Sequence, residues 1–497
     1  MDKKVFVRKF GNILELSGGG NLPISEEAVA RLAPKLSFNK KTYLTPYQRR
    51  LLNTTSKYQY ENIRIFDFDD HKRMCTCAGF LDRITTTLQQ NGFQVFYKDV
   101  SPVANERTFK PYVERVDNYF TYRPRQKECL QKILNSTSGI INAPTAFGKG
   151  TLMTMVAMAL PYAKIVVTTR RISVVETLYD RFSKIFPDVG QIGGGSKFMG
   201  DRITIVSGDS LHHMDGKADL VLVDEVHEYG ADSYAAQLSK FEHSRLFGFS
   251  ASPTGRFDGS DLRIEALFGK EIFKISYKEA ADLGMVVPIV VEWQDVVMDF
   301  NPVGDCTHDV QKKRLGIWTN DYRNDLIAEK AKSYGNCQVL ILVDTLEHAV
   351  NLHSRLPDFT CVYATAEEND LRNYRRKGLI GEDFPVLNKK KRKELKEQYE
   401  RGKLRHVIAT GVWAVGVDFT HLEVLIRCDG GSSEIASIQV PGRVARINKD
   451  ISKSVGVMVD FRDQFDTGFA AKARMRYGYY RDMEWEQLVG ESYAAKE

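Results

Sequence analysis

Short, almost uninterrupted runs of apolar residues recur along most of this chain and fall into two series. The first series is SGIINA (138–143), KIVVTT (164–169), ITIVS (203–207), LVLVDE (220–225) and RLFGFSA (245–251). The second is QVLILVD (338–344), FTCVYAT (359–365), RHVIAT (405–410), EVLIRCD (423–429) and VGVMVDF (455–461). Such runs are typical of strands in a parallel sheet that helices cover on both faces. The pattern therefore predicts an α/β protein with two consecutive parallel-sheet domains, over residues 111–287 and 288–469.

The first hundred residues follow a different pattern. Strand-like runs occur at 5–10, 12–16, 63–68 and 93–99, with one helical stretch at 79–93. This mixture predicts a small α+β domain over residues 1–110. The segment 101–117, which spans the boundary with the next domain, has the composition of a polar linker. The last segment, 470–497, is aromatic and basic at its start and is predicted to form a helical tail.

The composition limits the class of protein more than it identifies one. A chain of 497 residues is too long for one hydrophobic core. The net charge of +6 is a mild excess that does not separate a nucleic-acid-binding protein from an ordinary enzyme. The chain shows neither a membrane-length apolar run nor an export signal at its start, and its seven cysteines are scattered, unlike a disulfide framework. We therefore expect a cytoplasmic protein with no membrane partner.

The segment after the first buried strand has the composition of a phosphate-binding loop. A helical run, LMTMVAMAL, follows it, and the loop consists of Pro144, Thr145, Ala146, Phe147, Gly148, Lys149, Gly150 and Thr151. Backbone amides of such a loop face the phosphates, and Lys149 would neutralise their charge, so ATP and Mg2+ are the predicted ligands. The residue after the lysine is usually Ser or Thr, but here it is Gly150. Either Thr151 replaces it as a magnesium ligand, or the acidic motif and water hold the metal alone.

The acidic motif Asp224-Glu225-Val226-His227 follows the strand LVLV, at the end where open α/β sheets bind ligands. Asp224 would hold the magnesium ion, and Glu225 would orient and deprotonate the attacking water. His227 would sense the γ-phosphate or link the two domains. A single acidic pair is often only a solvated turn. However, two further strand–helix units separate Lys149 from Asp224, which is the spacing needed to bring both loops to one crevice.

A third motif, QVPGRVAR (439–446), lies in the second domain, and its arginines are predicted to share one helical face. The phosphate-binding loop, DEVH (224–227), SAS (250–252) and this segment, in that order, resemble the motifs of superfamily 2 helicases. The resemblance implies two RecA-like lobes and ATP hydrolysis. It also implies a catalytic role for Gln439 and arginine-finger roles for Arg443 and Arg446.

The resemblance implies roles for further residues. Gln126 of YRPRQ (122–126) would contact the adenine, and Gly416 and Asp418 would lie near the nucleotide. Short polar residues and amides at strand ends would bind the nucleic-acid backbone independently of its sequence. This set consists of Thr168, Thr169, Arg170, Gly194, Gly195, Ser207, Asp344 and Thr410.

Within the superfamily, IGGGSK, GFSASP and SIQVPGRVARINKD are most similar to phage branch-migration helicases of the UvsW type. This similarity implies that the protein remodels forked, branched, duplex or single-stranded DNA in replication, recombination and repair, with a duplex-binding N-terminal domain. We expect a monomer, in the host cytoplasm if a phage encodes the chain. An RNA helicase or RNA-dependent ATPase, a non-hydrolysing clamp suggested by Gly150, and the motor subunit of a restriction system remain alternatives. Ten basic residues between positions 372 and 396 form either a solvated loop or a helix or hairpin that touches a duplex.

Overall fold

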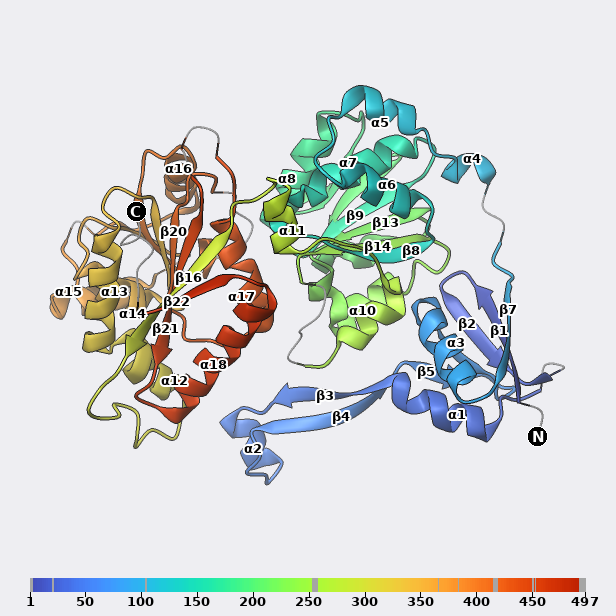
Figure 1. Ribbon diagram of the computed structural model, residues 1–497, viewed down its shortest axis with the longest axis horizontal. Coiled ribbons are helices and arrows are strands. Elements are labelled where there is room, and N and C mark those ends of the chain that lie inside the picture. Colours follow the sequence, from blue (N-terminus) through green and yellow to red (C-terminus); the bar gives the residue numbers. More distant parts are fainter. Residues whose placement is uncertain are drawn as a thin grey trace. The chain divides into compact units, whose positions relative to one another are not determined.

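The computed structural model describes residues 3–19, 22–102, 105–252, 258–364, 366–382, 384–413, 419–448, 451 and 453–490. The chain forms two compact units (Figure 1). The first combines Met1–Ala143 with Phe147–Ile275, and the second combines Pro144–Ala146 with Ser276–Glu497. The first unit holds the N-terminal domain and the first lobe, and the second unit holds the second lobe.

The N-terminal domain has a mixed sheet with strand order β5-β6-β2-β1-β7. Its strands are β1 (Lys4–Phe10), β2 (Ile13–Ser17), β5 (Phe66–Phe68), β6 (Met74–Cys77) and β7 (Gln94–Asp99). Alternate residues of β1 and β2, such as Val5, Val7 and Leu14, are buried and form a core with residues of the helices α1 (Glu26–Leu32) and α3 (Leu81–Gln90). This period of two is what a sheet with one covered face requires.

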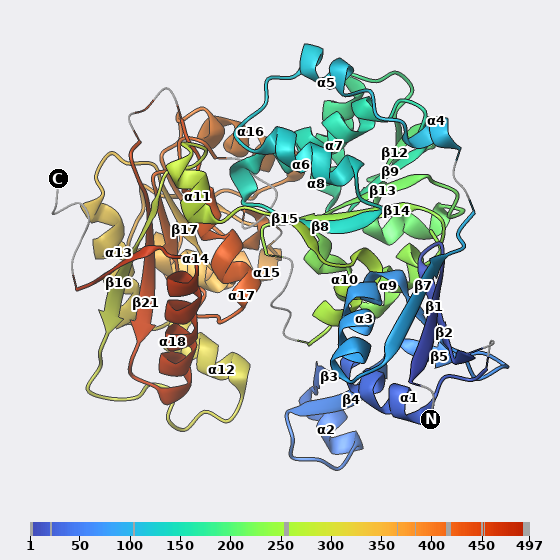
Figure 2. The same cartoon turned by 45° about the vertical axis from the view of Figure 1, so that its right-hand side comes forward.

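A two-stranded ribbon extends from this domain, and we call residues 37–64 the arm. Strands β3 (Ser37–Tyr43) and β4 (Tyr58–Arg64) pair antiparallel, and helix α2 (Pro46–Leu51) lies between them in sequence, at the far end of the ribbon (Figure 1 and Figure 2). The single strand predicted at 63–68 is therefore wrong. Arg64 ends the arm and Phe66 begins β5, because the chain leaves the ribbon at Ile65, whose N–H donates to the carbonyl of Leu36.

The described part of the first lobe contains a sheet with strand order β11-β10-β12-β9-β13-β14-β8-β15. The strands are β8 (Ser138–Asn142), β9 (Ile165–Thr169), β10 (Gly190–Gly193), β11 (Ser196–Phe198), β12 (Ile203–Ser207), β13 (Leu220–Asp224), β14 (Arg245–Ser250) and β15 (Glu271–Lys274). Neighbouring strands are parallel except β10 and β11. The carboxyl ends of β8, β9, β12, β13 and β14 therefore lie along one edge.

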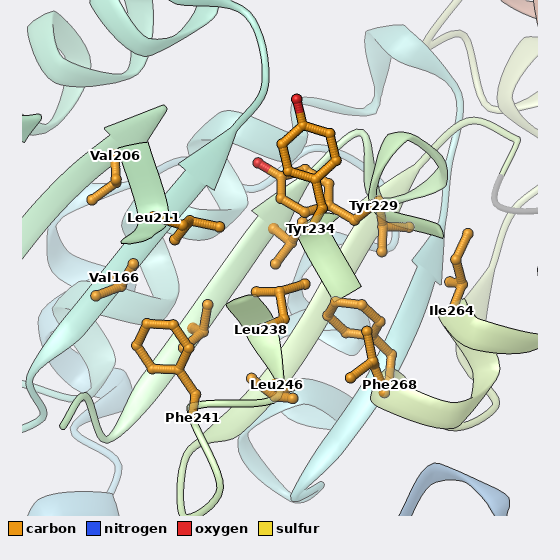
Figure 3. Close-up of a cluster of buried hydrophobic side chains, with 14 of the residues drawn as sticks. Val166, Val206, Leu211, Tyr229, Tyr234, Leu238, Phe241, Leu246, Ile264 and Phe268 are labelled. Carbon is orange, nitrogen blue, oxygen red and sulfur yellow. The ribbon is translucent and has the colours of Figure 1, made fainter. Parts of the chain in front are cut away.

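Helices bury the faces of this sheet. They are α6 (Gln126–Leu134), α7 (Lys149–Ala159), α8 (Ile172–Ser183), α9 (Asp232–Leu238) and α10 (Asp261–Phe268). Figure 3 shows the core in which Leu238 and Phe268 pack with Val166 and Leu246. This apolar cluster fixes the strands whose ends carry the candidate site.

The segment predicted as a polar linker is partly helical. It contains α4 (Glu106–Phe109) and the start of α5 (Val113–Tyr119). Val116 is buried, the Tyr112 N–H donates to the carbonyl of Ala159 at 2.8 Å, and the Arg245 guanidinium lies 3.8 Å from the ring centroid of Phe109. These few apolar residues anchor an otherwise polar segment to the first lobe, so the linker prediction was wrong here.

The described second lobe has an all-parallel sheet with strand order β18-β19-β17-β20-β21-β16-β22. The strands are β16 (Ile289–Val296), β17 (Val339–Leu342), β18 (Thr360–Val362), β19 (His406–Ala409), β20 (Val424–Arg427), β21 (Gly456–Asp463) and β22 (Glu486–Val489). Its helices are α11 (Tyr277–Asp282), α12 (Asp309–Lys313), α13 (Asp321–Ser333), α14 (Leu346–His353), α15 (Glu368–Arg376), α16 (Lys389–Glu400), α17 (Glu434–Gln439) and α18 (Thr467–Asp482). The predicted fold class, two tandem RecA-like lobes after a small α+β domain, is confirmed.

The end of the chain differs from the predicted helical tail. Helix α18 begins at Thr467, and Glu484, with a φ of +57°, turns the chain into β22, which pairs in parallel with β16. The indole N–H of Trp293 donates to the Gln487 side chain at 2.7 Å, and Leu488 is buried. The residues after α18 therefore form a strand, because the edge of β16 offers them backbone hydrogen bonds. None of the helices in the described ranges is both long and apolar enough to cross a bilayer.

Candidate nucleotide and nucleic-acid sites

The phosphate-binding loop leaves β8 and ends at Lys149, the first residue of α7. Gly148 has a φ of +83°, and a Cβ there would lie 2.9 Å from Nε2 of Gln126, so a side chain at this position would be strained. The Gln126 amide donates to the Phe147 carbonyl at 2.7 Å and accepts from the Arg123 N–H at 2.9 Å. Lys149 is buried, with Nζ 3.1 Å from the Ala143 carbonyl. Gln126 therefore braces the loop in this conformation, and its contact with adenine stays a prediction.

The structure separates Gly150 and Thr151 by environment. The Thr151 hydroxyl accepts a hydrogen bond from Arg181 at 2.5 Å. A Cβ at Gly150 would meet Leu178 Cδ2 at 3.4 Å and Arg181 Nε at 3.5 Å, which is ordinary contact. A serine would fit at position 150, whereas the Thr151 hydroxyl is already engaged. A magnesium-binding role for Thr151 stays a prediction.

The acidic motif lies at the carboxyl end of β13, and its geometry suits a cation. Asp224 is half-buried, but its Oδ1 atom is buried and has no hydrogen-bond partner among the described residues. Burial and the neighbouring Glu225 carboxylate raise the pKa of Asp224 to about 7, while the charge of Lys149 opposes this rise. Glu225 has a φ of +50°, in the left-handed region. A buried carboxylate oxygen beside a lysine, at the end of a glycine-shaped loop, fits a magnesium–nucleotide ligand.

Ser250, at the end of β14, connects the acidic motif with the strand that leads into the phosphate-binding loop. Its hydroxyl lies 2.9 Å from Nδ1 of His227 and accepts a hydrogen bond from the Ser252 N–H at 3.1 Å. Its carbonyl accepts a hydrogen bond from the Ala143 N–H at 2.9 Å. His227 Nδ1 is also 3.5 Å from the Glu225 carboxylate. The three motifs are therefore joined by direct contacts along one sheet edge.

The candidate strand-binding loops of the first lobe lie along the same edge, after β9, β10 and β12. The Thr168 hydroxyl is buried and lies 2.9 Å from the Tyr229 hydroxyl, and the Arg170 guanidinium lies 5.4 Å from the ring centroid of Tyr234. Figure 3 shows the hydroxyls of both tyrosines at one end of the core. Tyr229 comes two residues after His227, so these rings connect the candidate strand-binding loops with the acidic motif. Sequence reasoning missed them, because aromatic residues after a strand usually indicate only core.

The remaining loop residues differ in what they expose. The side chain of Thr169 is buried, and the Ser207 hydroxyl donates to Ser210 at 2.8 Å. Gly194 and Gly195 have φ values of +65° and +96° in the turn between β10 and β11. Gly194 and Gly195 are exposed, whereas the side chains of Thr168 and Thr169 are buried. Strand binding by these residues stays a prediction.

In the second lobe the predicted helical face of the two arginines is wrong. Helix α17 ends at Gln439, Pro441–Arg443 form one 3-10 turn, and no helix continues to Arg446. Pro441 has no N–H to continue the α-helical ladder. Arg443 is buried and Arg446 is half-buried, so their environments differ. Arginine-finger roles for both stay predictions.

The other described candidates of the second lobe follow the carboxyl ends of the neighbouring strands β17 and β19. Thr410 is buried, and its N–H donates to the carbonyl of Val362. The Asp344 carboxylate lies 2.6 Å from Lys313, and burial raises its pKa. Gly416 and Asp418 lie outside the described residues.

A buried network of charges, which sequence reasoning missed, holds α17 against the sheet. Arg427 on β20 pairs with Asp429 at 2.6 Å and donates to the Ser437 hydroxyl on α17 at 2.8 Å. Asp460 accepts hydrogen bonds from Arg476 and Tyr480. Buried arginines are stable only with such partners. The network thereby positions the helix that ends at Gln439.

The basic stretch 372–396 divides between α15 and α16. Its run of lysines opens α16, where the Asn388 side chain caps the N–H of Lys391 at 2.8 Å. The structure therefore favours the helical alternative over a solvated loop for these residues. The lysines lie at the helix N-terminus, where positive charge is unfavourable because of the helix dipole. Contact with a duplex stays a prediction.

Comparison with protein families finds two matched regions. Residues 119–255 match "Type III restriction enzyme, res subunit", and residues 380–448 match "Helicase conserved C-terminal domain". The first region holds the phosphate-binding loop and the acidic motif, and the second holds Arg443 and Arg446.

Two curated proteins are similar. A candidate helicase, number 22, of Sulfolobus islandicus filamentous virus (isolate Iceland/Hveragerdi) is 26% identical over 65% of this chain. The matched region spans 60% of that viral protein's length. The DNA 3'-5' translocase XPB2 of Sulfurisphaera tokodaii is 23% identical over 65% of this chain and 78% of its own length.

Solved structures with a similar fold include S. cerevisiae Dbp5 bound to RNA and ADP BeF3. That match covers 76% of this chain and 92% of the other, with a TM-score of 0.50 and 13% identity. The structure of UvsW from phage T4 matches over 98% of this chain and 99% of the other, with a TM-score of 0.42 and 15% identity.

Proposed function

We propose that this chain, a superfamily 2 helicase by its two matched regions and its RecA-like lobes, is an ATP-driven DNA translocase that remodels forked or branched DNA. The observation that carries the proposal is the contact set of Ser250. It joins the strand of the phosphate-binding loop, through Ala143, to the acidic motif, through His227. A change at the nucleotide would thereby reach the neighbouring strand-binding loops.

Each residue of the proposed ATP site has a defined task. Lys149 would neutralise phosphate charge, Asp224 would hold the cation, and Glu225 would accept the proton of the attacking water. A bound magnesium ion would supply further neutralisation of the phosphate charge. Arg443, contributed by the second lobe, would stabilise the charge on the transferred phosphoryl group.

DNA is the proposed partner for two reasons. One similar protein is named as a DNA translocase, and the sequence motifs resemble phage branch-migration helicases. Residues 1–110 are proposed to be a duplex-binding domain. On this basis the protein acts in fork reversal and branch migration, as a monomer. The fold is shared with RNA-bound Dbp5, so RNA is the alternative that the experiment must separate.

The test compares ATP hydrolysis with forked DNA, plain duplex DNA, single-stranded DNA and RNA of matched length. We expect the forked DNA to stimulate hydrolysis most and to be converted to displaced strands only with ATP. If RNA alone stimulated ATP hydrolysis, RNA and not DNA would be the partner. Equal background hydrolysis by the native chain and Glu225→Gln would indicate a non-hydrolysing clamp.

A further inference from the structure

The arm carries a concentrated positive charge. Its 28 residues include six basic residues against a single acidic one, Glu61, whereas the whole chain has a net charge of only +6. The basic residues are Lys40, Lys41, Arg49, Arg50, Lys57 and Arg64. Such a concentration indicates a polyanionic partner.

Exposed tyrosine rings accompany this charge. Tyr47, on α2, is 74% exposed, and Tyr60, on β4, is 62% exposed. The described arm pairs with no third strand, so these rings have no core to fill. Tyrosine rings beside basic side chains suit the stacked bases and phosphates of unpaired nucleotides. Fully paired DNA offers phosphates but hides its base faces, so the arm is suited to a branch point with unpaired nucleotides.

The root of the arm contacts the segments that follow the ATPase motifs of the first lobe. Lys40 Nζ lies 2.5 Å from the carboxylate of Asp232, the first residue of α9, which follows the turn Val226–Gly230 of the acidic motif. The Lys41 N–H donates at 3.3 Å to the carbonyl of Asp258, six residues after Ser252.

Arg263, on α10, connects the arm with both segments. It pairs with Asp232, donates to the Gly230 carbonyl at 3.4 Å, and lies with its guanidinium 5.2 Å from the ring centroid of Phe38 in β3. Lys40 and Arg263 therefore share one carboxylate. A phosphate that attracts Lys40 would leave Asp232 to Arg263 alone and would change the force on the turn of the acidic motif.

We propose that the arm binds unpaired nucleotides at a branch point, and that Lys40, Asp232 and Arg263 transmit this binding to the acidic motif so that hydrolysis accelerates. The inference rests on the proposed function, since it names the substrate feature that stimulates the same ATPase. Arg263 acts here as a positioning residue, through Gly230 and Asp232.

The first test measures binding by fluorescence anisotropy of a fork with unpaired ends and of a blunt duplex of equal length. Tyr47→Ala/Tyr60→Ala should weaken fork binding about tenfold and leave duplex binding unchanged, because only unpaired bases stack. Tyr119→Ala is the control, since this ring is 58% exposed on α5. Fork affinity equal to that of the native chain would overturn the proposal. Binding of the arm to anionic phospholipid vesicles in place of the fork would overturn it too.

The second test measures hydrolysis at saturating fork. Arg263→Gln should keep the basal rate without DNA and reduce fork stimulation at least about fivefold. Lys40→Ala leaves Asp232 to Arg263 alone, as a bound phosphate would, so it should raise the basal rate and reduce the fold stimulation by the fork. The control is Asp82→Asn, which removes the 2.7 Å ion pair with Lys270 between the same domain and lobe. It should keep full stimulation.

The outcomes separate this inference from the proposed function. Full stimulation in both variants, or an equal loss of basal and stimulated rates, would overturn the coupling alone. A native chain that no nucleic acid stimulates would overturn the proposed function and the coupling together.

Discussion

Replacing Asp224 with Asn should stabilise the first lobe of the metal-free, nucleotide-free protein, and the gain should increase with pH. The Oδ1 atom of Asp224 is buried without a hydrogen-bond partner among the described residues, and the pKa of this carboxyl is raised from 3.8 to about 7. The unfolded chain releases this proton near pH 4, whereas the folded chain retains it up to about pH 7. The native protein therefore loses stability across this window as the pH rises, and the loss is constant above it.

The magnitude follows from the size of the shift. Three pKa units at about 1.4 kcal/mol each give an upper limit of about 4 kcal/mol at pH 8. The asparagine amide is also a buried polar group, which costs about 1–3 kcal/mol. A net stabilisation of about 2 kcal/mol at pH 8 is expected, with none, or a small loss, at pH 4.

The assay uses the distribution of tryptophan. All four tryptophans, Trp293, Trp318, Trp413 and Trp485, lie in the second unit, so their fluorescence follows that unit alone, while far-ultraviolet circular dichroism follows both. Urea unfolding is followed at pH 4, 6 and 8. The unfolding midpoint of Asp224→Asn should differ from that of the native chain by circular dichroism, and the two midpoints should agree by tryptophan fluorescence. A difference in unfolding free energy between the variant and the native chain that is constant with pH, or that grows as the pH falls, would refute the reasoning.

Four further substitutions test three separate parts of the structure. Glu225→Gln should bind nucleotide normally but hydrolyse it about 10²–10⁴-fold more slowly in a single turnover, and an unchanged rate would remove Glu225 as the base. Gly150→Ser should fold and lower the magnesium concentration for half-maximal hydrolysis. Thr151→Ala should change this magnesium concentration little, because the Thr151 hydroxyl is already bound to Arg181. A Thr151→Ala variant without magnesium-dependent activity would contradict this expectation. Arg323→Met leaves the buried carboxylate of Asp463 without its ion-pair partner. It should destabilise the second unit by about 3–5 kcal/mol in unfolding followed by tryptophan fluorescence. A loss below about 1 kcal/mol would contradict a stabilising role for this buried ion pair.

Much of the two lobes could be predicted because their strands are continuous apolar runs. LVLVDE, for example, became β13 almost residue for residue. The arm could not, since Ser37–Tyr43 and Tyr58–Arg64 are polar on both faces and carry no apolar alternation. Strand β22 was missed for another reason, because its stability comes from the open edge of β16.

The sequence predicted where the motifs of the candidate site lie, but not which side chains contact each other there. Family resemblance to superfamily 2 helicases is confirmed by the matched regions, and the motifs of the first lobe follow strand ends as expected. The contacts that join them, such as His227 with Ser250 and Thr168 with Tyr229, connect residues far apart in sequence and leave no local pattern. The arginines of QVPGRVAR do not share one helix, because Pro441 cannot donate the N–H that would continue α17.

The most direct test of an ATP site that needs both lobes is hydrolysis by Arg443→Ala. The proposed function predicts that its affinity for a non-hydrolysable ATP analogue stays within about threefold of the native chain, while fork-stimulated turnover falls by about 10³-fold or more. Turnover equal to that of the native chain would contradict a two-lobe ATP site.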